Sequence, residues 1–223
     1  MAAASFATSG FALIPELLAA VECEAIANLA QPASPSVGSR SLLAQPWCAT
    51  LAHRLRSHAG ISQLMPAAYV AVQCTFFEKS TEQNWLVPVH QDLSIPVAER
   101  VADPNLHGWS EKEGSTFVHA PVEILEQLIA VRLHLDPCEA ADGPLRVVPG
   151  SHQLGILSPE ESVRVRDEGS EVSCELGRGG ALIMRPLILH ASSKAKGESR
   201  RRVLHFVFGP PGLPHRLRWQ YAV

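Results

Sequence analysis

The sequence predicts a mainly β protein with flanking α-helices, built as a sandwich, barrel or jelly roll. After residue 68 the chain contains short runs rich in Val, Ile, Leu and Phe, separated by Gly, Pro, Asp and Ser, a pattern typical of antiparallel β architectures. Before residue 60, two segments have the apolar spacing of helices. The 223 residues, 46% hydrophobic, are enough to bury one core. We therefore expect a single domain, 1–223, with helices within about 15–60 and the β-structure over about 68–210.

Two helices are expected near the N-terminus. In Pro15–Ala30, the proline lies in the first turn and the apolar residues recur at helical spacing. The stretch 31–39, rich in Pro, Ser and Gly, ends this helix. In Trp47–His58, Leu51 and Leu55 share an apolar face, which predicts the second helix.

Seven runs are expected to form β-strands. In chain order they are Ala68–Phe77, Leu86–Val97, Ile129–Asp136, Leu145–Val148, Val172–Leu176, Ala181–His190 and Arg201–Phe208. Between the second and third runs lies Ala98–Pro121, a polar segment with Gly, Trp and charged residues. It is too long for a simple hairpin loop, so we expect a lid or substrate loop.

Composition argues against several classes of partner. The chain has 19 Lys and Arg against 22 Asp and Glu, a net charge of -3, so it has no basic field to hold nucleic acid or an anionic membrane. The first 14 residues lack a basic n-region, and the weakly charged stretch 61–77 is broken by Pro66 and Gln73. We expect neither an export signal nor a membrane span.

Cysteine spacing indicates a reducing compartment. The five cysteines lie far apart, form no C-x-x-C pair and are odd in number. This pattern argues against both a zinc ribbon and a disulfide framework. We therefore expect reduced thiols and a cytoplasmic location.

Two His-x-Asp triplets are candidate metal ligands. His90 and Asp92 lie in one strand-like run, and because side chains alternate along a strand, both project from the same face. His134 and Asp136 have the same spacing in another run, so periodicity leaves both pairs open. A proline and a turn follow Asp136 at once, which favours a structural role for this carboxylate in satisfying nearby backbone donors.

A third ligand is needed, and His190 is the best-placed candidate because it ends the apolar run Ala181–Leu189. Two histidines and one carboxylate leave coordination positions open for substrate and dioxygen, as in non-haem Fe(II) oxygenases. Zinc prefers a closed tetrahedron or richer nitrogen and sulfur ligation. The alternative for a lone histidine at a strand end is a capped or solvated side chain.

Arginines at 200–202 open the last strand. An oxygenase with a dicarboxylate cosubstrate needs a cation for the far carboxylate, and a guanidinium can supply two charge-assisted hydrogen bonds. Arg201 shares a face with His205, whereas Arg202 shares one with Phe206, so alternation sends one of the two inward. The pattern does not say which, and a solvated basic run is the alternative.

Four pieces of sequence, taken in order, span nearly the whole chain. They are Gly10–Pro15 (GFALIP), Val89–Leu93 (VHQDL), Asp142–His152 (DGPLRVVPGSH) and His190–Ser193 (HASS), the last followed by Arg201. Together they resemble the phytanoyl-CoA dioxygenase family of Fe(II)/2-oxoglutarate oxygenases, and the combination is far more specific than any single piece.

The resemblance implies a fold, cofactors and ligands. The fold would be a double-stranded β-helix, a cupin-like jelly roll, with Fe(II) as the metal and 2-oxoglutarate as the cosubstrate. The implied iron ligands are His90, Asp92 and His190. Arg201, rather than Arg202, would bind the 5-carboxylate of 2-oxoglutarate. Further cosubstrate contacts would come from Ser192, Gln73 and Trp109.

Four other residues are candidates to line the substrate pocket. They are Lys79, Asn84, Arg132 and His134, and each could equally be a satisfied surface or supporting group. Ser151 is not expected to be a nucleophile because the G-x-S-x-G motif is absent, which argues against a hydrolase. The segment 98–121 mixes Trp109 with charges, so a simple fatty acyl chain is not the expected substrate.

The implied activity is hydroxylation of an unidentified small molecule, with 2-oxoglutarate and O2 converted to succinate and CO2. Because Asp92 is present, a halide cannot readily take the place of the carboxylate, which disfavours halogenation. Two alternatives remain open: a cupin-like metal enzyme that does not use 2-oxoglutarate, and a non-catalytic jelly roll that binds a metal or metabolite. No heptad or unbroken apolar face predicts an oligomeric state.

Overall fold

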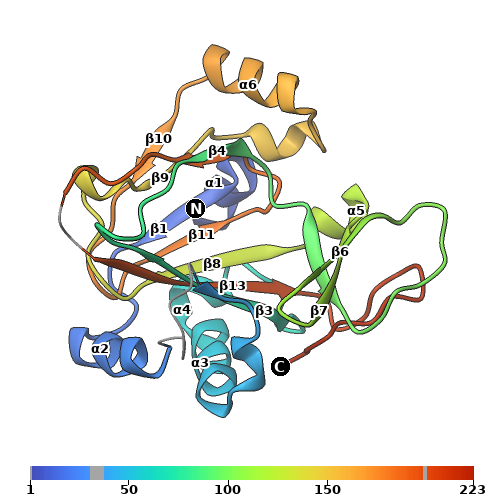
Figure 1. Ribbon diagram of the computed structural model, residues 1–223, viewed down its shortest axis with the longest axis horizontal. Helices are drawn as coiled ribbons and strands as arrows, with labels where there is room; N and C mark the ends of the chain where they lie inside the picture. Colours follow the sequence, from blue (N-terminus) through green and yellow to red (C-terminus); the bar gives the residue numbers. More distant parts are fainter. Residues whose placement is uncertain (1, 31–37, 198–199) are drawn as a thin grey trace.

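Two antiparallel sheets face each other in the computed structural model, which describes residues 2–30, 38–197 and 200–223 (Figure 1). In these residues the larger sheet has the order β1 (Phe11–Ile14), β11 (Ala181–Met184), β8 (Ile129–His134), β13 (Arg201–Gly209), β3 (Val70–Lys79) and β2 (Gly38–Ser39). The smaller sheet has the order β10 (Val172–Cys174), β9 (Leu145–Val147), β12 (His190–Ser192) and β4 (Val87–His90). The predicted mainly β jelly roll with flanking helices is confirmed.

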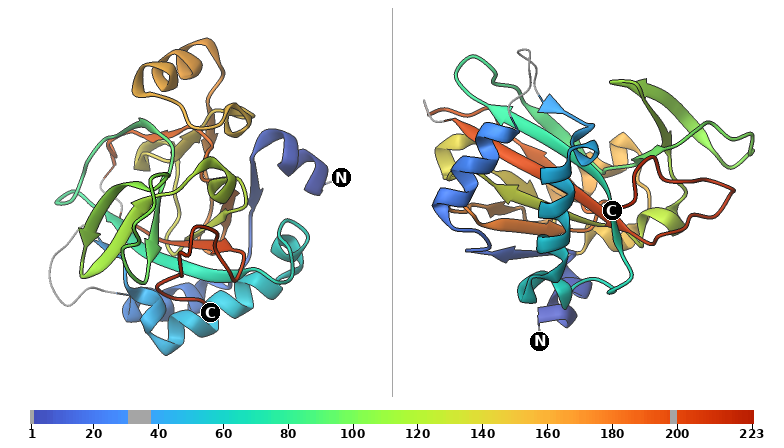
Figure 2. Two further views of the ribbon diagram at one scale, coloured as in Figure 1. Left: turned by 90° about the vertical axis from the view of Figure 1, so that its right-hand side faces the viewer. Right: turned by 90° about the horizontal axis from the view of Figure 1, so that it is seen from below.

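Helices cover the outer face of the larger sheet. α2 (Ala20–Leu29), α3 (Pro46–Ser57) and α4 (Ala59–Ser62) lie beneath β13 and β3 in Figure 1, and Figure 2 shows the same layer from the side and from below. Leu204 and Phe206 of β13 pack into this layer with Leu55 of α3, all fully buried. Because side chains alternate along a strand, Arg201 and His205 of β13 face the opposite way, into the space between the sheets.

The predicted second helix is confirmed to within one residue at each end. The first begins at Ala20 rather than Pro15, because the N–H groups of Leu17 and Leu18 both donate to the Gly179 carbonyl, at 2.8 and 3.2 Å, and so hold that segment in a loop. The stretch 31–39 was expected to end the first helix, and its residues 31–37 lie outside the described residues.

Several short elements were not predicted. They are α1 (Ala2–Ser9), α5 (Val122–Leu125), α6 (Pro159–Glu168) and the 3-10 turns η1 (Leu42–Ala44), η2 (Ala140–Asp142) and η3 (Ser151–Leu154). The sequence did carry a signal for α6. Ser158 caps it by accepting a hydrogen bond from the Glu161 N–H, and the Glu161 carboxylate accepts one from Ser158 N–H in return.

Two predicted strands each divide into two. Leu86–Val97 becomes β4 and β5 (Ser94–Val97), separated at Asp92, whose N–H donates to the Pro186 carbonyl at 2.9 Å instead of continuing the ladder. Ala181–His190 becomes β11 and β12, which lie in different sheets. The second corner was concealed because Leu187 and Ile188 in it are themselves buried and apolar. The first was missed because Gln91 and Asp92 lie inside one continuous strand-like run.

The segment Ala98–Pro121 is a β-hairpin, so its prediction as a loop was wrong. It contains β6 (His107–Lys112) and β7 (Ser115–His119), and β7 also pairs with β5 to give a third sheet. The tip at Glu113 has a φ of 52° and is followed by Gly114 at 72°. Val118 of β7 is buried in a separate apolar cluster, which fixes the hairpin beside the opening between the sheets.

The described residues contain no helix long and apolar enough to cross a membrane. All five cysteines are buried and free of disulfide bonds.

Candidate active site

Two neighbouring strands of the smaller sheet bring the predicted metal ligands together. His90 ends β4 and His190 begins β12, and the antiparallel register places them directly opposite each other. Asp92 follows β4, with its carboxylate oxygens 3.8 Å from His90 Nε2 and 3.7 Å from His190 Nε2. The ligand atoms all lie within 4.8 Å of one another, and the described residues contain only this one cluster of three or more potential metal ligands.

Backbone carbonyls fix the protonation of both histidines. Each Nδ1 lies 2.9 Å from the carbonyl oxygen two residues earlier, that of Pro88 for His90 and that of Ile188 for His190. Because a carbonyl only accepts, each Nδ1 must carry the hydrogen, which leaves the Nε2 lone pair directed at the cluster. Burial lowers the pKa of His190 to about 4 and keeps it neutral.

The carboxylate of Asp92 completes the donor set as an anion. Desolvation raises its pKa, but the nearby histidines, His190 first, outweigh this and leave the pKa below its usual value. Two imidazoles and one carboxylate on one side of a cavity match the facial triad of non-haem Fe(II) sites, with coordination positions left open. These residues therefore fit an Fe(II) ion.

Gln91, between two of the ligands, anchors the segment that carries them. Its Nε2 donates to the carbonyls of Gly155 and Leu187, at 2.8 and 2.7 Å, and its Oε1 accepts from Leu157 N–H at 2.9 Å. Its side chain is buried. A satisfied buried amide of this kind holds the irregular backbone after β4 and so orients Asp92.

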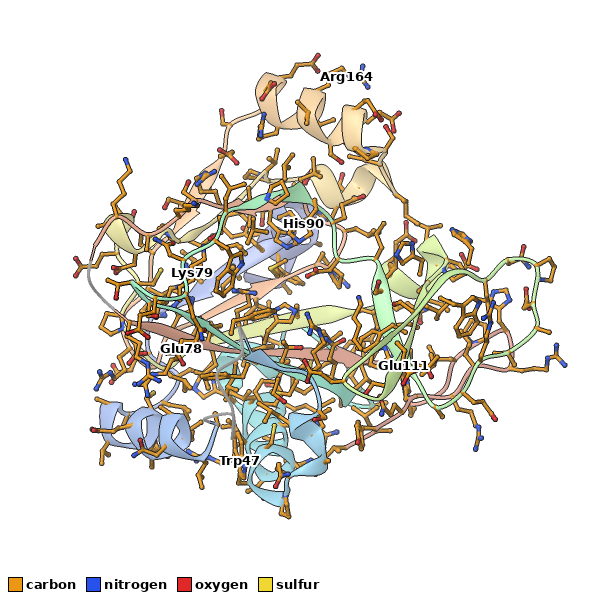
Figure 3. All side chains as sticks on the ribbon, in the orientation of Figure 1. Trp47, Glu78, Lys79, His90, Glu111 and Arg164 are labelled. Carbon is orange, nitrogen blue, oxygen red and sulfur yellow. The ribbon has the colours of Figure 1, made fainter. Side chains whose placement is uncertain are left out.

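A cavity of about 420 Å³ opens beside the triad, between the two sheets. Its charge is unbalanced, because five basic residues line it and Asp92 is the only acidic one among the described lining residues. The basic residues are Arg40, Lys79, Lys112, Arg132 and Arg201. In the described part of the chain, only Arg40 among them forms an ion pair with a carboxylate. Figure 3 shows Lys79 and His90 in the space between the sheets.

Arg201 and Lys79 form one basic end of this cavity. They are directly paired across β13 and β3. Lys79 Nζ donates to Ser192 Oγ and to the Ser193 carbonyl, both at 2.8 Å, while Arg201 Nη1 and Ser192 Oγ both donate to the Gly143 carbonyl. Arg201 Nε has no partner in the described residues. Burial first, then Arg201 and Arg132, lower the pKa of Lys79 to about 8.

His205, which was not predicted as a site residue, lies between Arg132 and Asp92 of the triad. Arg132 Nη1 donates to His205 Nδ1 at 3.2 Å, so the hydrogen of the imidazole lies on Nε2, which faces Asp92 Oδ2 at 3.9 Å. Burial and then Arg132 lower the pKa of His205 to about 3, so it is neutral. The available signal was alternation, since His205 lies on the same face of β13 as Arg201.

The structure separates Arg201 from Arg202. Arg202 leaves the cavity and makes a two-pronged ion pair with Asp136, at 2.7 and 2.8 Å, and Arg178 adds a contact at 3.6 Å. Asp136 is thus a structural carboxylate, as its turn context indicated. The other member of the second triplet, His134, is buried and does not line the cavity, and its Nδ1 has no hydrogen-bond partner among the described residues.

The other predicted residues divide between the cavity and the surrounding structure. Gln73 lines the cavity and donates to Thr75 Oγ1 at 3.0 Å, and Ser192 and Arg132 line it too. Asn84 lies outside, where its amide exchanges two hydrogen bonds of 2.8 Å with the backbone of Ala195. Trp109 also lies outside and packs on the cluster under the hairpin, with Arg100 5.4 Å from its ring centroid.

An antiparallel jelly roll that carries two histidines and one carboxylate beside a basic cavity is the arrangement of the non-haem iron oxygenases. The chain matches the phytanoyl-CoA dioxygenase (PhyH) family over residues 6–203, and it belongs to that family. The family predicted from the four sequence pieces is confirmed. A search of curated proteins gives no match.

Solved structures with the same fold share little sequence with this chain. The non-heme alpha ketoglutarate dependent carbocyclase SnoK from nogalamycin biosynthesis is 15% identical with a TM-score of 0.66, covering 94% of this chain and 83% of its own. HygX from Streptomyces hygroscopicus, crystallised with nickel and 2-oxoglutarate, is 19% identical at 0.63, covering 92% and 84%. EctD from S. alaskensis is 16% identical at 0.68, covering 93% and 75%.

The ligand assignment predicts distinct effects for the two His-x-Asp triplets. His90→Ala and Asp92→Ala should each weaken Fe(II) binding by more than about 100-fold, since loss of a supporting residue alone commonly costs 10- to 100-fold. His134→Ala should leave Fe(II) affinity unchanged. Anaerobic Fe(II) titration, with circular dichroism to verify folding, measures these effects. Retained affinity in either of the first two variants contradicts the assignment, and loss in the third moves the metal to the other triplet.

Proposed function

We propose that the protein is an Fe(II)- and 2-oxoglutarate-dependent dioxygenase that hydroxylates a small-molecule substrate. The observation that carries this proposal is the facial triad at the side of a cavity whose far end holds two basic residues, Arg201 and Lys79, without carboxylate partners in the described residues. The solved structure of HygX with nickel and 2-oxoglutarate, in the same fold, supports it.

When Fe(II) and 2-oxoglutarate are bound, they supply O2 activation coupled to the conversion of 2-oxoglutarate into succinate and CO2. The chain's own residues bind and orient the reactants. His90, Asp92 and His190 would hold the metal, and Arg201, Lys79 and the Ser192 hydroxyl are placed to receive the distal carboxylate of the cosubstrate. Binding of this anion would give the unpaired guanidinium and ammonium the partner that the fold does not supply.

Hydroxylation is the proposed outcome, although solved structures of this fold include a carbocyclase and an epimerase. Epimerisation must return a hydrogen to the opposite face of the oxidised carbon, which requires a donor such as a Tyr hydroxyl or a Cys thiol. Among the described residues, the cavity lining contains neither type. Asp92 also occupies the ligand position that a halide would need, so transfer of a hydroxyl group is the simplest reaction for this site.

The five free, buried cysteines fit a reducing compartment, and we propose a cytoplasmic location.

Arg201→Ala tests the cosubstrate directly, without knowledge of the substrate. Purified protein with Fe(II) and O2 should release succinate from 2-oxoglutarate slowly, and Arg201→Ala should raise the KM for 2-oxoglutarate by about 10- to 100-fold, the effect of losing one or two charge-assisted hydrogen bonds. The matched control is Arg200→Ala, which removes an exposed arginine paired with Glu78. An equal KM in the two variants contradicts the role of Arg201, and no succinate release from wild type favours a cupin-like enzyme that does not use 2-oxoglutarate.

Lys79 should give 2-oxoglutarate binding an alkaline limit. Its pKa is lowered to about 8 in the free protein, and a dianion binds best when the ammonium is protonated. As the pH rises through 8, affinity for 2-oxoglutarate should fall, approaching tenfold per pH unit. Lys79→Met should bind 2-oxoglutarate more weakly than wild type at pH 7, and its affinity should not fall as the pH rises through 8. Calorimetry between pH 7 and 9.5 measures the affinity for 2-oxoglutarate in both proteins. If the affinity of the variant falls with pH as in wild type, a group other than Lys79 is responsible.

A further inference from the structure

A second basic end of the cavity lies at the hairpin. Lys112, the last residue of β6, and Arg40, which follows β2, both line the cavity. Arg40 is paired with Glu113 through a side-chain bond of 3.0 Å and a bond of 2.7 Å from its backbone N–H. Lys112 has no such partner in the described residues. The pair therefore ties the hairpin tip to the segment after β2 and leaves Lys112 as the uncompensated charge.

Lys112 is partly buried against an aromatic ring. Its Nζ lies 5.0 Å from the ring centroid of Phe117, which lines the cavity from the opposing strand. Burial first and then Arg40 lower the pKa of Lys112, and the only group that raises it is Asp92 of the triad. A partly desolvated ammonium held beside another cation costs free energy unless an anion compensates it.

The two basic ends are separate. The charges that act on Lys79 are those of Arg201, Arg132, Cys138 and Arg146, whereas those that act on Lys112 are Arg40 and Asp92. In the view of Figure 3, Lys79 lies on one side of His90 and the hairpin residue Glu111 on the other. Lys79 and Arg201 lie on the paired strands β3 and β13 of the larger sheet, whereas Lys112 ends β6 in the third sheet. The basic end at the hairpin has no assigned ligand.

We propose that the substrate to be oxidised carries an anionic group, a carboxylate or phosphate, and that Lys112 binds it. This inference rests on the proposed function, because 2-oxoglutarate must occupy the end at Arg201 for the hairpin end to remain free. Phe117 offers the adjoining apolar surface, so the substrate class is a small organic anion with an apolar or aromatic body. Lys112 is then a specificity-determining residue, and it positions the substrate from the side opposite the cosubstrate.

Fragment binding to the protein loaded with Zn(II) and saturating 2-oxoglutarate tests this role. The probes are benzoate, phenyl phosphate and the neutral benzamide, measured by ligand-observed NMR or calorimetry. Wild type should prefer the anions over benzamide by about tenfold, the effect of one charge-assisted hydrogen bond. Lys112→Gln should lose this preference and Lys112→Arg should restore it. Lys196→Gln, which changes an exposed lysine outside the cavity, should keep it.

The outcomes separate this inference from the function on which it rests. Equal binding of all three probes to wild type, or a preference that survives in Lys112→Gln, overturns the role of Lys112. If 2-oxoglutarate binds wild type normally in either case, the proposed function is untouched. Failure of 2-oxoglutarate to bind wild type contradicts the proposed function itself. Weaker 2-oxoglutarate binding in Lys112→Gln, with unchanged binding in Arg201→Ala, would reverse the assignment of the two ends and overturn the inference.

Discussion

The antiparallel pairing of β4 with β12 is the constraint on which the site depends. It places His90 opposite His190, and the backbone carbonyl two residues before each histidine then holds Nδ1 protonated and Nε2 free. Asp92 reaches the same point only because the chain leaves the ladder after His90, with Gln91 anchoring the turn. A one-residue shift in this register would turn one imidazole to the opposite face and dismantle the triad.

Charge compensation is the second organising feature. Two ion pairs connect structural elements: Arg202 and Asp136 join β13 to the end of β8, and Arg40 and Glu113 fix the hairpin. Around the cavity the fold leaves cations without carboxylates in the described residues, at a cost in folding free energy that the rest of the core must offset. Sites that bind anions commonly carry such a cost, because the ligand supplies the missing charge.

Much of this could be predicted from the sequence, and the failures have physical causes. Local patterns indicated the helix at 46–57 and most strands, and the linked motifs indicated the metal ligands. The division of the strand at 181–190 was hidden because the corner at Leu187 is as apolar as the strands it joins. The division at Asp92 was hidden because it depends on a backbone hydrogen bond to Pro186, far away in the sequence. Alternation alone could not choose between Arg201 and Arg202, since the choice depends on which sheet face the helices cover. His205 was missed because its role comes from Arg132 on a neighbouring strand, a contact that no local pattern encodes.

We propose that one cavity binds Fe(II) and 2-oxoglutarate together, through the triad and Arg201. Anaerobic titration of the metal-free protein with Fe(II) and then 2-oxoglutarate tests it most directly, by the weak visible absorption that arises when the keto acid chelates the metal. This band should develop in wild type and should require much more 2-oxoglutarate in Arg201→Ala. Fe(II) binding with no band at any 2-oxoglutarate concentration would contradict the proposal and reduce the family relationship to one of fold.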